Sequence, residues 1–112
     1  MALLTATRPT AAGVAWAPAA VSSSDTISAN DLGQAGAWLV VLNGGGSPDN
    51  VTVSDAGVTP AGNAATTVAN AVAATSSEVM YISPRQVNLA TGLVTVTHSF
   101  TTSVTYVLLP LG

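Results

Sequence analysis

The sequence predicts an all-β fold, a small antiparallel β-sandwich or jelly-roll-like barrel of about seven or eight strands with an extended N-terminal arm. From residue 22 onward, short runs rich in valine, threonine and aromatic residues are separated by glycine, proline and asparagine. Several of these runs alternate apolar and polar residues, as strands with one buried face do. Residues 1–20 show neither this period nor a helical one. We therefore expect an extended N-terminal arm over residues 1–20 and a β-sandwich body over residues 21–112.

The first half of the body contains three predicted strands. Residues 25–28 form the first, closed by turn formers. Residues 36–42 are apolar throughout, which is typical of a strand covered on both faces, so we expect a central strand with Trp38 in the core. The glycine-rich segment 43–50 predicts a hairpin connection with glycines at positive φ. It leads into a strand over residues 51–55, whose valines share one face.

The second half continues the same pattern. Residues 57–63 predict a turn, and residues 64–74 are ambiguous because alanine favours a helix while valine and threonine favour a strand. We favour a strand there. Residues 78–82 precede a Ser-Pro stop, residues 93–98 alternate clearly after a Thr-Gly turn, and residues 103–109 form the last strand.

Charged residues make up 6% of the chain and give it a net charge of -3. No cationic surface is available for a phosphate backbone or an anionic membrane, so we expect neither nucleic acid nor a membrane as a partner. The lack of cysteine excludes disulfides and thiolate metal sites. No apolar run approaches the roughly 20 residues that span a bilayer. Residues 1–9 lack the positive segment of a secretion signal, so we expect synthesis in a cytoplasm.

No catalytic constellation is recognisable in the sequence. A hydrolytic triad needs a nucleophile, a base and an orienting acid, but His98 is the single histidine and no Gly-x-Ser-x-Gly motif occurs. His98 lies on the same side of its predicted strand as Val94 and Val96. We therefore expect His98 to be a hydrogen-bonded residue at the edge of the core. We therefore expect a protein that is not an enzyme, with no catalytic residue and no cofactor.

The acidic residues flank predicted strands, with Asp25 and Asp31 around the first and Asp49 and Asp55 around a later one. Paired acids can cleave glycosidic bonds or bind calcium. However, no Asp-x-Asp-x-Asp loop is present, and aspartate beside asparagine or glycine is ordinary turn chemistry. The glycine run 44–46 is not a phosphate loop, because no lysine follows it. We predict turns here, and no metal site.

The low content of charged residues allows two interpretations of the protein surface. Interface cores are depleted of lysine, glutamate and aspartate, so neighbouring molecules could cover much of this chain. Alternatively, a neutral, hydroxyl-rich surface is simply soluble. The apolar residues of the arm and the two arginines, which can pair with carboxylates, are the candidate contacts. They are Leu3, Leu4, Arg8, Val14, Trp16 and Arg85. The alternatives are a frayed terminus with Trp16 on its own domain, and solvated arginines.

Strand and turn patterns in residues 25–27, 38–46, 51–53, 59–63 and 94–99 resemble those of small β-rich proteins encoded among the head genes of tailed bacteriophages. These are capsid decoration, or minor capsid, proteins. The similarity contains no catalytic signature, and it assigns no functional residue by motif. The arm is similar in kind to arms that such proteins lay along the shell or along a neighbouring copy.

The resemblance implies a non-enzymatic structural protein that binds the outer surface of a bacteriophage capsid. Its partner would be the major capsid protein, whose adjacent subunits it would bridge, and it would assemble as a homo-oligomer, with a homotrimer favoured. Its place would be the outer capsid surface of the virion, after synthesis in the cytoplasm of a bacterial host. The alternatives are a carbohydrate-binding β-sandwich module, with Trp16, Trp38, Tyr81 and Tyr106 as candidate stacking residues, or a virion surface adhesion or fibre subunit.

Overall fold

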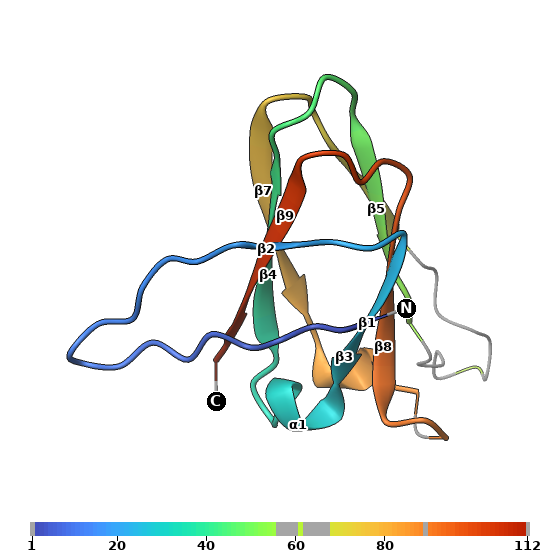
Figure 1. The fold of residues 1–112 in the computed structure, drawn as a ribbon. Coiled ribbons are helices and arrows are strands. Elements are labelled where there is room, and N and C mark those ends of the chain that lie inside the picture. The colour runs from blue at the N-terminus through green and yellow to red at the C-terminus, as the bar shows by residue number, and fades with distance from the viewer. Residues whose placement is uncertain (1, 56–60, 62–67, 89, 112) are drawn as a thin grey trace.

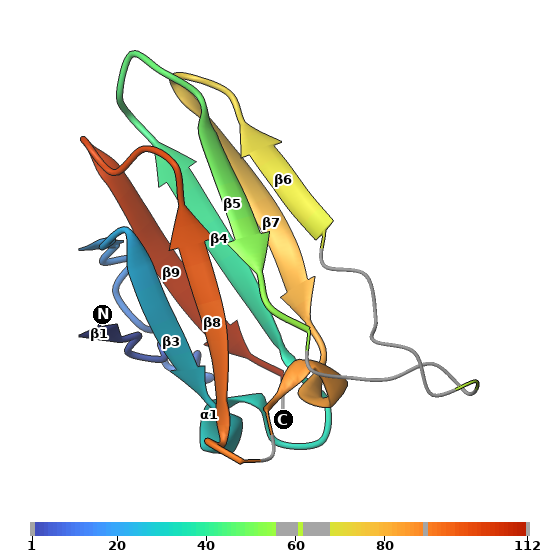
Figure 2. The same ribbon diagram turned by 90° about the vertical axis from the view of Figure 1, so that its right-hand side faces the viewer.

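The computed structural model describes residues 2–55, 61, 68–88 and 90–111. In this part of the chain, two β-sheets pack face to face as a sandwich (Figures 1 and 2). The five-stranded sheet contains, in spatial order, β1 (Ala2–Leu3), β3 (Ser24–Ser28), β8 (Leu93–His98), β5 (Asp49–Val53) and β6 (Val68–Val72). The four-stranded sheet contains β2 (Ala19–Ala20), β9 (Val104–Pro110), β4 (Ala37–Asn43) and β7 (Ser76–Ile82). The predicted β-sandwich is confirmed.

Two short helices close one end of the sandwich, at the bottom of Figure 2. Helix α1 (Ala29–Leu32) begins at Ser28, whose side chain accepts a hydrogen bond from the main chain of Asn30. The 3-10 helix η1 (Pro84–Gln86) begins at Ser83 with a capping box, in which the side chains of Ser83 and Gln86 each bond the other end of the turn. The predicted Ser-Pro stop after β7 is therefore the start of a helical turn.

Most predicted strands agree with the observed ones. Strand β8 has the predicted bounds, β3 begins one residue early, β9 is shifted by one residue at both ends, and β7 begins two residues before the predicted start. The described part of the ambiguous stretch is strand β6. Residues 64–67, and the predicted turn over residues 57–63 apart from Ala61, lie outside the described residues.

The predicted hairpin over residues 43–50 is wrong, because β4 and β5 belong to different sheets. The connection crosses the end of the sandwich, and none of its glycines is among those with positive φ. Gly45 is needed there for a different reason. A side chain on Gly45 would overlap the ring of Phe100 and would lie 2.6 Å from the carbonyl oxygen of Thr102. The glycine lets this loop pack closely on the turn between β8 and β9.

The core lies between the sheets and consists mainly of aliphatic side chains at every second strand position. In the five-stranded sheet, Ile27, Val51, Val94 and Val96 are fully buried. Leu39, Val41, Ile82 and Leu108 face them from the four-stranded sheet. Burial of each such side chain stabilises the folded state by roughly 1.5–3 kcal/mol. The alternation seen in the sequence therefore corresponds to one buried and one outward face for each sheet.

Most of the predicted arm is part of the sandwich. Strand β1 pairs in parallel with β3, and the amide of Leu4 donates to the carbonyl oxygen of Thr26 at 2.8 Å. The amide of Thr7 donates to the carbonyl oxygen of Leu108, and β2 pairs with the same strand, β9. These bonds satisfy main-chain groups that would otherwise be unpaired at the edges of β3 and β9. Within the predicted arm, only residues 8–18 project from the body (Figure 1).

Leu4 shows the difference between the expected arm and the observed one. We predicted an intermolecular contact for Leu4, but its side chain is 4% exposed and belongs to the core of the sandwich. The neighbouring Leu3 points outward and is 59% exposed. Successive residues of an extended chain face opposite sides, so docking one leucine displays the other. The prediction is therefore wrong for Leu4, and the body is not complete without residues 2–7.

A carboxylate and an imidazole form a buried pair at the other end of the sandwich, opposite α1. Nδ1 of His98 lies 2.6 Å from Oδ2 of Asp49, a separation that requires a proton between the two atoms. Oδ1 of Asp49 accepts hydrogen bonds from the amides of Ser99 and Phe100 at 3.0 and 3.2 Å. The expectation of a hydrogen-bonded His98 is confirmed. The expectation that Asp49 only shapes a turn is wrong, because it begins β5 and is fully buried.

The other acidic residues have different surroundings. Asp25, the first residue of the predicted strand over residues 25–28, lies within β3, is 1% exposed and faces the interior. Its Oδ2 accepts a hydrogen bond from the amide of Ser22 at 2.9 Å, whereas Oδ1 has no hydrogen-bond partner among the described residues. Asp31 lies in α1 and pairs with Arg8. Asp55 follows β5 and is half-buried.

We predict that Leu4→Ala lowers the free energy of unfolding by about 2–5 kcal/mol, because it leaves a cavity in the core. The matched control is Leu3→Ala, which should change this free energy by less than about 0.5 kcal/mol, because Leu3 points to solvent. Urea denaturation followed by circular dichroism measures both values. Equal losses for the two variants would contradict the docking of residues 2–7.

We also predict that Asp49→Asn lowers the free energy of unfolding by about 3 kcal/mol, because an amide cannot accept all three hydrogen bonds that the carboxylate accepts. The control is Glu78→Gln, which removes an exposed carboxylate from β7 and should cost less than about 0.5 kcal/mol. Thermal and urea unfolding report on both variants. A loss for Asp49→Asn no larger than for Glu78→Gln would refute the role of Asp49.

Candidate interaction surface

The six residues predicted to make intermolecular contacts occupy different parts of the structure. Val14 and Trp16 lie in the projecting loop of residues 8–18, with 48% and 59% of their surface exposed. Leu3 is exposed on β1, and Leu4 is buried as described above. Arg85 is exposed on η1, at the end of the sandwich with α1. The structure thus brings Val14 and Trp16 together, and it places Arg85 apart from them.

The projecting loop is fixed to the body at both ends. The segment before it bonds β9 through Thr7, and β2 follows it on the same strand, with Ala19 opposite Tyr106. Nη2 of Arg8 pairs with Oδ1 of Asp31 at 3.3 Å, an ion pair within the chain rather than the predicted intermolecular one. At the tip, the amide of Gly13 donates to the carbonyl oxygen of Thr10 in a tight turn. The loop therefore presents Val14 and Trp16 on a closed stem.

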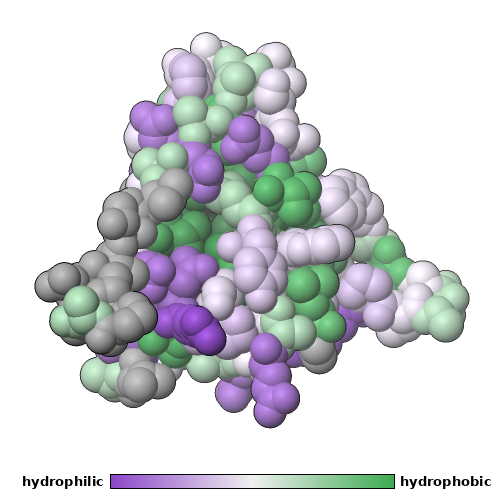
Figure 3. Space-filling model, turned by 180° about the vertical axis from the view of Figure 1, so that it is seen from behind, coloured by the Kyte–Doolittle hydropathy of each residue, from purple (hydrophilic) through white to green (hydrophobic). Residues whose placement is uncertain are grey.

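A second apolar surface covers the outward face of β4 and β7. Trp38 lies directly opposite Tyr81 in the register of the two strands, and Val40 lies opposite Val79. Trp38, Tyr81 and Val79 are 47%, 54% and 61% exposed. Seen from the side on which β6 and β7 form the edges, apolar side chains gather near the middle of the molecule (Figure 3).

Trp38 corrects a prediction from the sequence. Strand β4 is central in its sheet, between β9 and β7, as expected. Its outward face is only partly covered, however, because Trp38 is 47% exposed whereas Val40 on the same face is buried. A strand that is apolar throughout predicts two buried faces, but here the large aromatic residue of the outward face remains at the surface. Sequence reasoning missed the pairing of Trp38 with Tyr81, because the register of two distant strands carries no local signal.

The Tyr81 side chain is held in one position by the loop before β4. Its hydroxyl donates a hydrogen bond to the carbonyl oxygen of Ala35 at 2.8 Å. Gly36 lies beneath the ring, and a Cβ added to it would lie 2.8 Å from the Tyr81 hydroxyl and 2.9 Å from ring atom Cε1. Gly36 also has a φ of 84°, which disfavours any other residue. An exposed aromatic ring is thus fixed without being covered.

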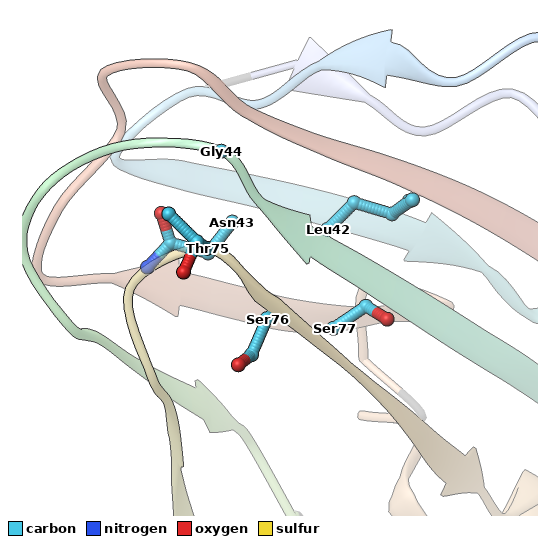
Figure 4. A pocket seen from close by; sticks show the side chains of 6 residues that line it. All are labelled: Leu42, Asn43, Gly44, Thr75, Ser76 and Ser77. Atoms are coloured by element: carbon cyan, nitrogen blue, oxygen red, sulfur yellow. The ribbon is translucent and has the colours of Figure 1, made fainter.

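A shallow hollow lies at the other end of the same two strands (Figure 4). It has a volume of about 360 Å³ and is lined by Leu42, Asn43, Gly44, Thr75, Ser76 and Ser77. The Asn43 side chain is engaged in structural bonds, donating to the carbonyl oxygens of Ser47 and Val72 and accepting from the amide of Gly45. The lining is mainly apolar, and its other polar side chains are the hydroxyls of Thr75, Ser76 and Ser77, of which Thr75 already donates to the carbonyl oxygen of Ala74.

The outward face of the five-stranded sheet has a different character. Its register places Thr26 opposite Thr95, and Thr97 opposite Thr52. Alanines of β6 extend this face at the sheet edge. Thr26 is buried, Thr52 and Thr95 are half-buried and Thr97 is exposed, so this face presents uncharged hydroxyl groups mainly over β5 and β8. The exposed Leu3 lies beside Thr26 at the edge of the same face.

The buried pair of Asp49 and His98 does not form an accessible reactive site. Their side chains are 0% and 1% exposed, so a substrate cannot reach them without opening the sandwich. Within the described residues, no group of three or more histidine, aspartate or glutamate side chains is placed to hold a metal ion. No helix in this part of the chain is long and apolar enough to cross a bilayer.

No protein-family model matches this chain. Neither the curated proteins nor the solved structures gave a significant match. Function is therefore inferred from the two exposed apolar surfaces, the projecting loop and the outward face of β4 and β7.

We predict that Gly36→Ala lowers the free energy of unfolding by about 2 kcal/mol or more, because the new Cβ meets the main chain of Ile82 and the backbone is strained. Gly46→Ala is the matched control. Its Cβ would enter open space, so its effect should stay below about 1 kcal/mol. Chemical denaturation measures both, and similar values for the two variants would show that Gly36 does not seat Tyr81.

Proposed function

We propose that this protein is a non-enzymatic structural component of a tailed-bacteriophage head. It binds the outer surface of the capsid and stabilises the shell by bridging adjacent major capsid subunits. The observation that carries this proposal is the projecting loop, whose Val14 and Trp16 are exposed on a stem bonded to β9. The class of partner comes from the strand and turn patterns that resemble capsid decoration proteins.

The loop is suited to anchor the protein on a larger surface. Tryptophan is enriched among the residues that dominate binding energy at protein interfaces. Residues 9–18 carry no charge, so their contacts depend on apolar burial rather than on ion pairs. Because both ends of the loop are bonded to the body, less conformational entropy is lost on binding than for a free tail.

A structural role also agrees with the properties of the body. Ligands that bind one state of an assembly stabilise that state by mass action, so a protein that binds many repeated sites strengthens a shell without any reaction. Cyclic symmetry would use each contact several times, and a homotrimer at a local threefold position is the arrangement that we propose. The burial of the Asp49 and His98 side chains supports a role without catalysis.

The test uses capsids of the phage that encodes this chain, prepared without the protein. Replacing Val14 and Trp16 together by alanine should weaken capsid binding about ten-fold or more, because it removes the apolar anchor. Trp38→Ala is the matched control, because it removes an equally large exposed ring from a different surface and should retain binding. Occupancy is measured by co-sedimentation over a range of protein concentrations.

Binding of the wild-type protein should also persist in high salt, because exposed ion pairs are screened whereas apolar contacts are not. Failure of the wild-type protein to bind these capsids would overturn the proposed function. Unchanged occupancy of the Val14 and Trp16 double variant would overturn the role of the loop.

A further inference from the structure

We propose that the outward face of β4 and β7 is a binding site for neutral glycans. Trp38 and Tyr81 form an aromatic platform for one sugar ring, and the part of the hollow lined by Leu42 and Ser77 receives an adjoining part of the same oligosaccharide. This site is separate from the loop that we assign to the capsid, and it does not depend on that assignment.

The aromatic platform is preformed in the free protein. Trp38 and Tyr81 are directly opposite on neighbouring antiparallel strands, where side chains on the same face lie side by side. The hydroxyl of Tyr81 is held by the carbonyl oxygen of Ala35, and its ring is seated on Gly36. An exposed ring that is already fixed loses little entropy when a flat ligand stacks on it. The apolar C–H face of a pyranose ring is such a ligand.

The hollow lies at a suitable distance for a second contact. Trp38 and Leu42 are four positions apart on β4, which corresponds to about 13 Å along the strand. Ser77 lies opposite Leu42, so these two residues of the hollow share the face of the aromatic pair, whereas Ser76, opposite Asn43, points to the other side. This separation fits a short oligosaccharide that stacks one ring on the platform and directs a hydroxyl group of another part toward Ser77.

The size of the apolar patch favours a small ligand over a second copy of the chain. Trp38, Tyr81 and Val79 are each about half exposed, which leaves roughly 300 Å² of side-chain surface between them. A stable protein interface needs about 800 Å² on each partner. A patch of this size is within the range of functional surface patches on monomers.

The charge of the face selects the class of glycan. Neither β4 nor β7 contains a lysine or arginine, and Glu78 lies opposite the core residue Val41, so it belongs to the other face of the sheet. A sialylated, sulfated or phosphorylated sugar would meet no cation on these two strands to balance its charge. Neutral hexoses and N-acetylhexosamines carry the hydroxyl and amide groups that serine and threonine can bond.

The test begins with the wild-type protein and three neutral probes, cellotriose, maltotriose and triacetylchitotriose. In proton–nitrogen correlation spectra, the indole signal of Trp38 should shift and saturate with at least one probe, while the signal of Trp16 stays in place. Trp16 is an internal control because it is exposed to a similar degree. Sialyllactose should produce no saturable shift. This measurement needs no variant, so it does not depend on the folding of one.

Variants then locate the site. Trp38→Ala and Tyr81→Ala should each weaken binding about ten-fold or more, and Ser77→Ala should weaken it by about two- to ten-fold through the loss of a hydrogen bond. Trp16→Ala should bind as the wild type does. Isothermal titration calorimetry gives the affinities, and circular dichroism confirms that each variant is folded.

Three results would overturn the proposal. One is the absence of a saturable Trp38 shift with all three neutral probes at millimolar concentrations. Another is an equal loss of affinity in Trp16→Ala and Trp38→Ala. The third is a wild-type oligomer that becomes a monomer in Trp38→Ala while no probe binds, which would assign the face to a second copy. Capsid occupancy of Trp38→Ala, measured separately, distinguishes a failure of this site from a failure of the proposed function.

Discussion

The buried carboxylate of Asp49 closes one end of the sandwich, and both the core and the surface loops depend on it. It accepts a hydrogen bond from His98 and from the two amides that follow, so the first residue of β5 is tied to the turn between β8 and β9. A buried carboxylate without donors would be strongly unfavourable. Because its donors are about 50 residues away along the chain, they are in place only when the whole sheet has formed. Gly45 then allows the loop after β4 to pack against Phe100 at the same end.

The surface of the protein carries few charged side chains. Hydroxyl-bearing and aliphatic side chains occupy the positions that charged residues usually take. On the five-stranded sheet, threonines of β5 and β8 place uncharged hydroxyl groups on the outward face. On the four-stranded sheet, the outward face is apolar, and its two aromatic rings remain exposed. The loop over residues 8–18 adds a second exposed apolar surface that projects from the body. We assign these two surfaces to different occupants because one projects on a stem, as suits a large partner, whereas the other is a small pair of exposed aromatic rings on a sheet face, with Tyr81 held by Ala35.

Local patterns predicted the strands well, since a strand with one buried face must alternate, as residues 93–98 do. They did not predict where the chain goes between strands. The glycine-rich segment 43–50 indicates a bend, but the same residues suit a hairpin and a crossing between sheets. The exposure of Trp38 could not be predicted either, because an apolar residue looks the same whether its own chain, a partner or solvent covers it. Leu3 and Leu4 were likewise indistinguishable until the pairing of β1 with β3 placed one inside and the other outside.

The division of the surface between two occupants is the central claim, and fluorescence quenching of each tryptophan tests it most directly. Trp38→Phe and Trp16→Phe leave a single tryptophan in the loop or on the sheet, respectively. In the free protein, acrylamide should quench both, since both are about half exposed. On the capsid, Trp16 should become protected while Trp38 stays accessible and is protected only when a neutral oligosaccharide is added. Protection of Trp38 by the capsid alone, with Trp16 still quenched, would contradict the account.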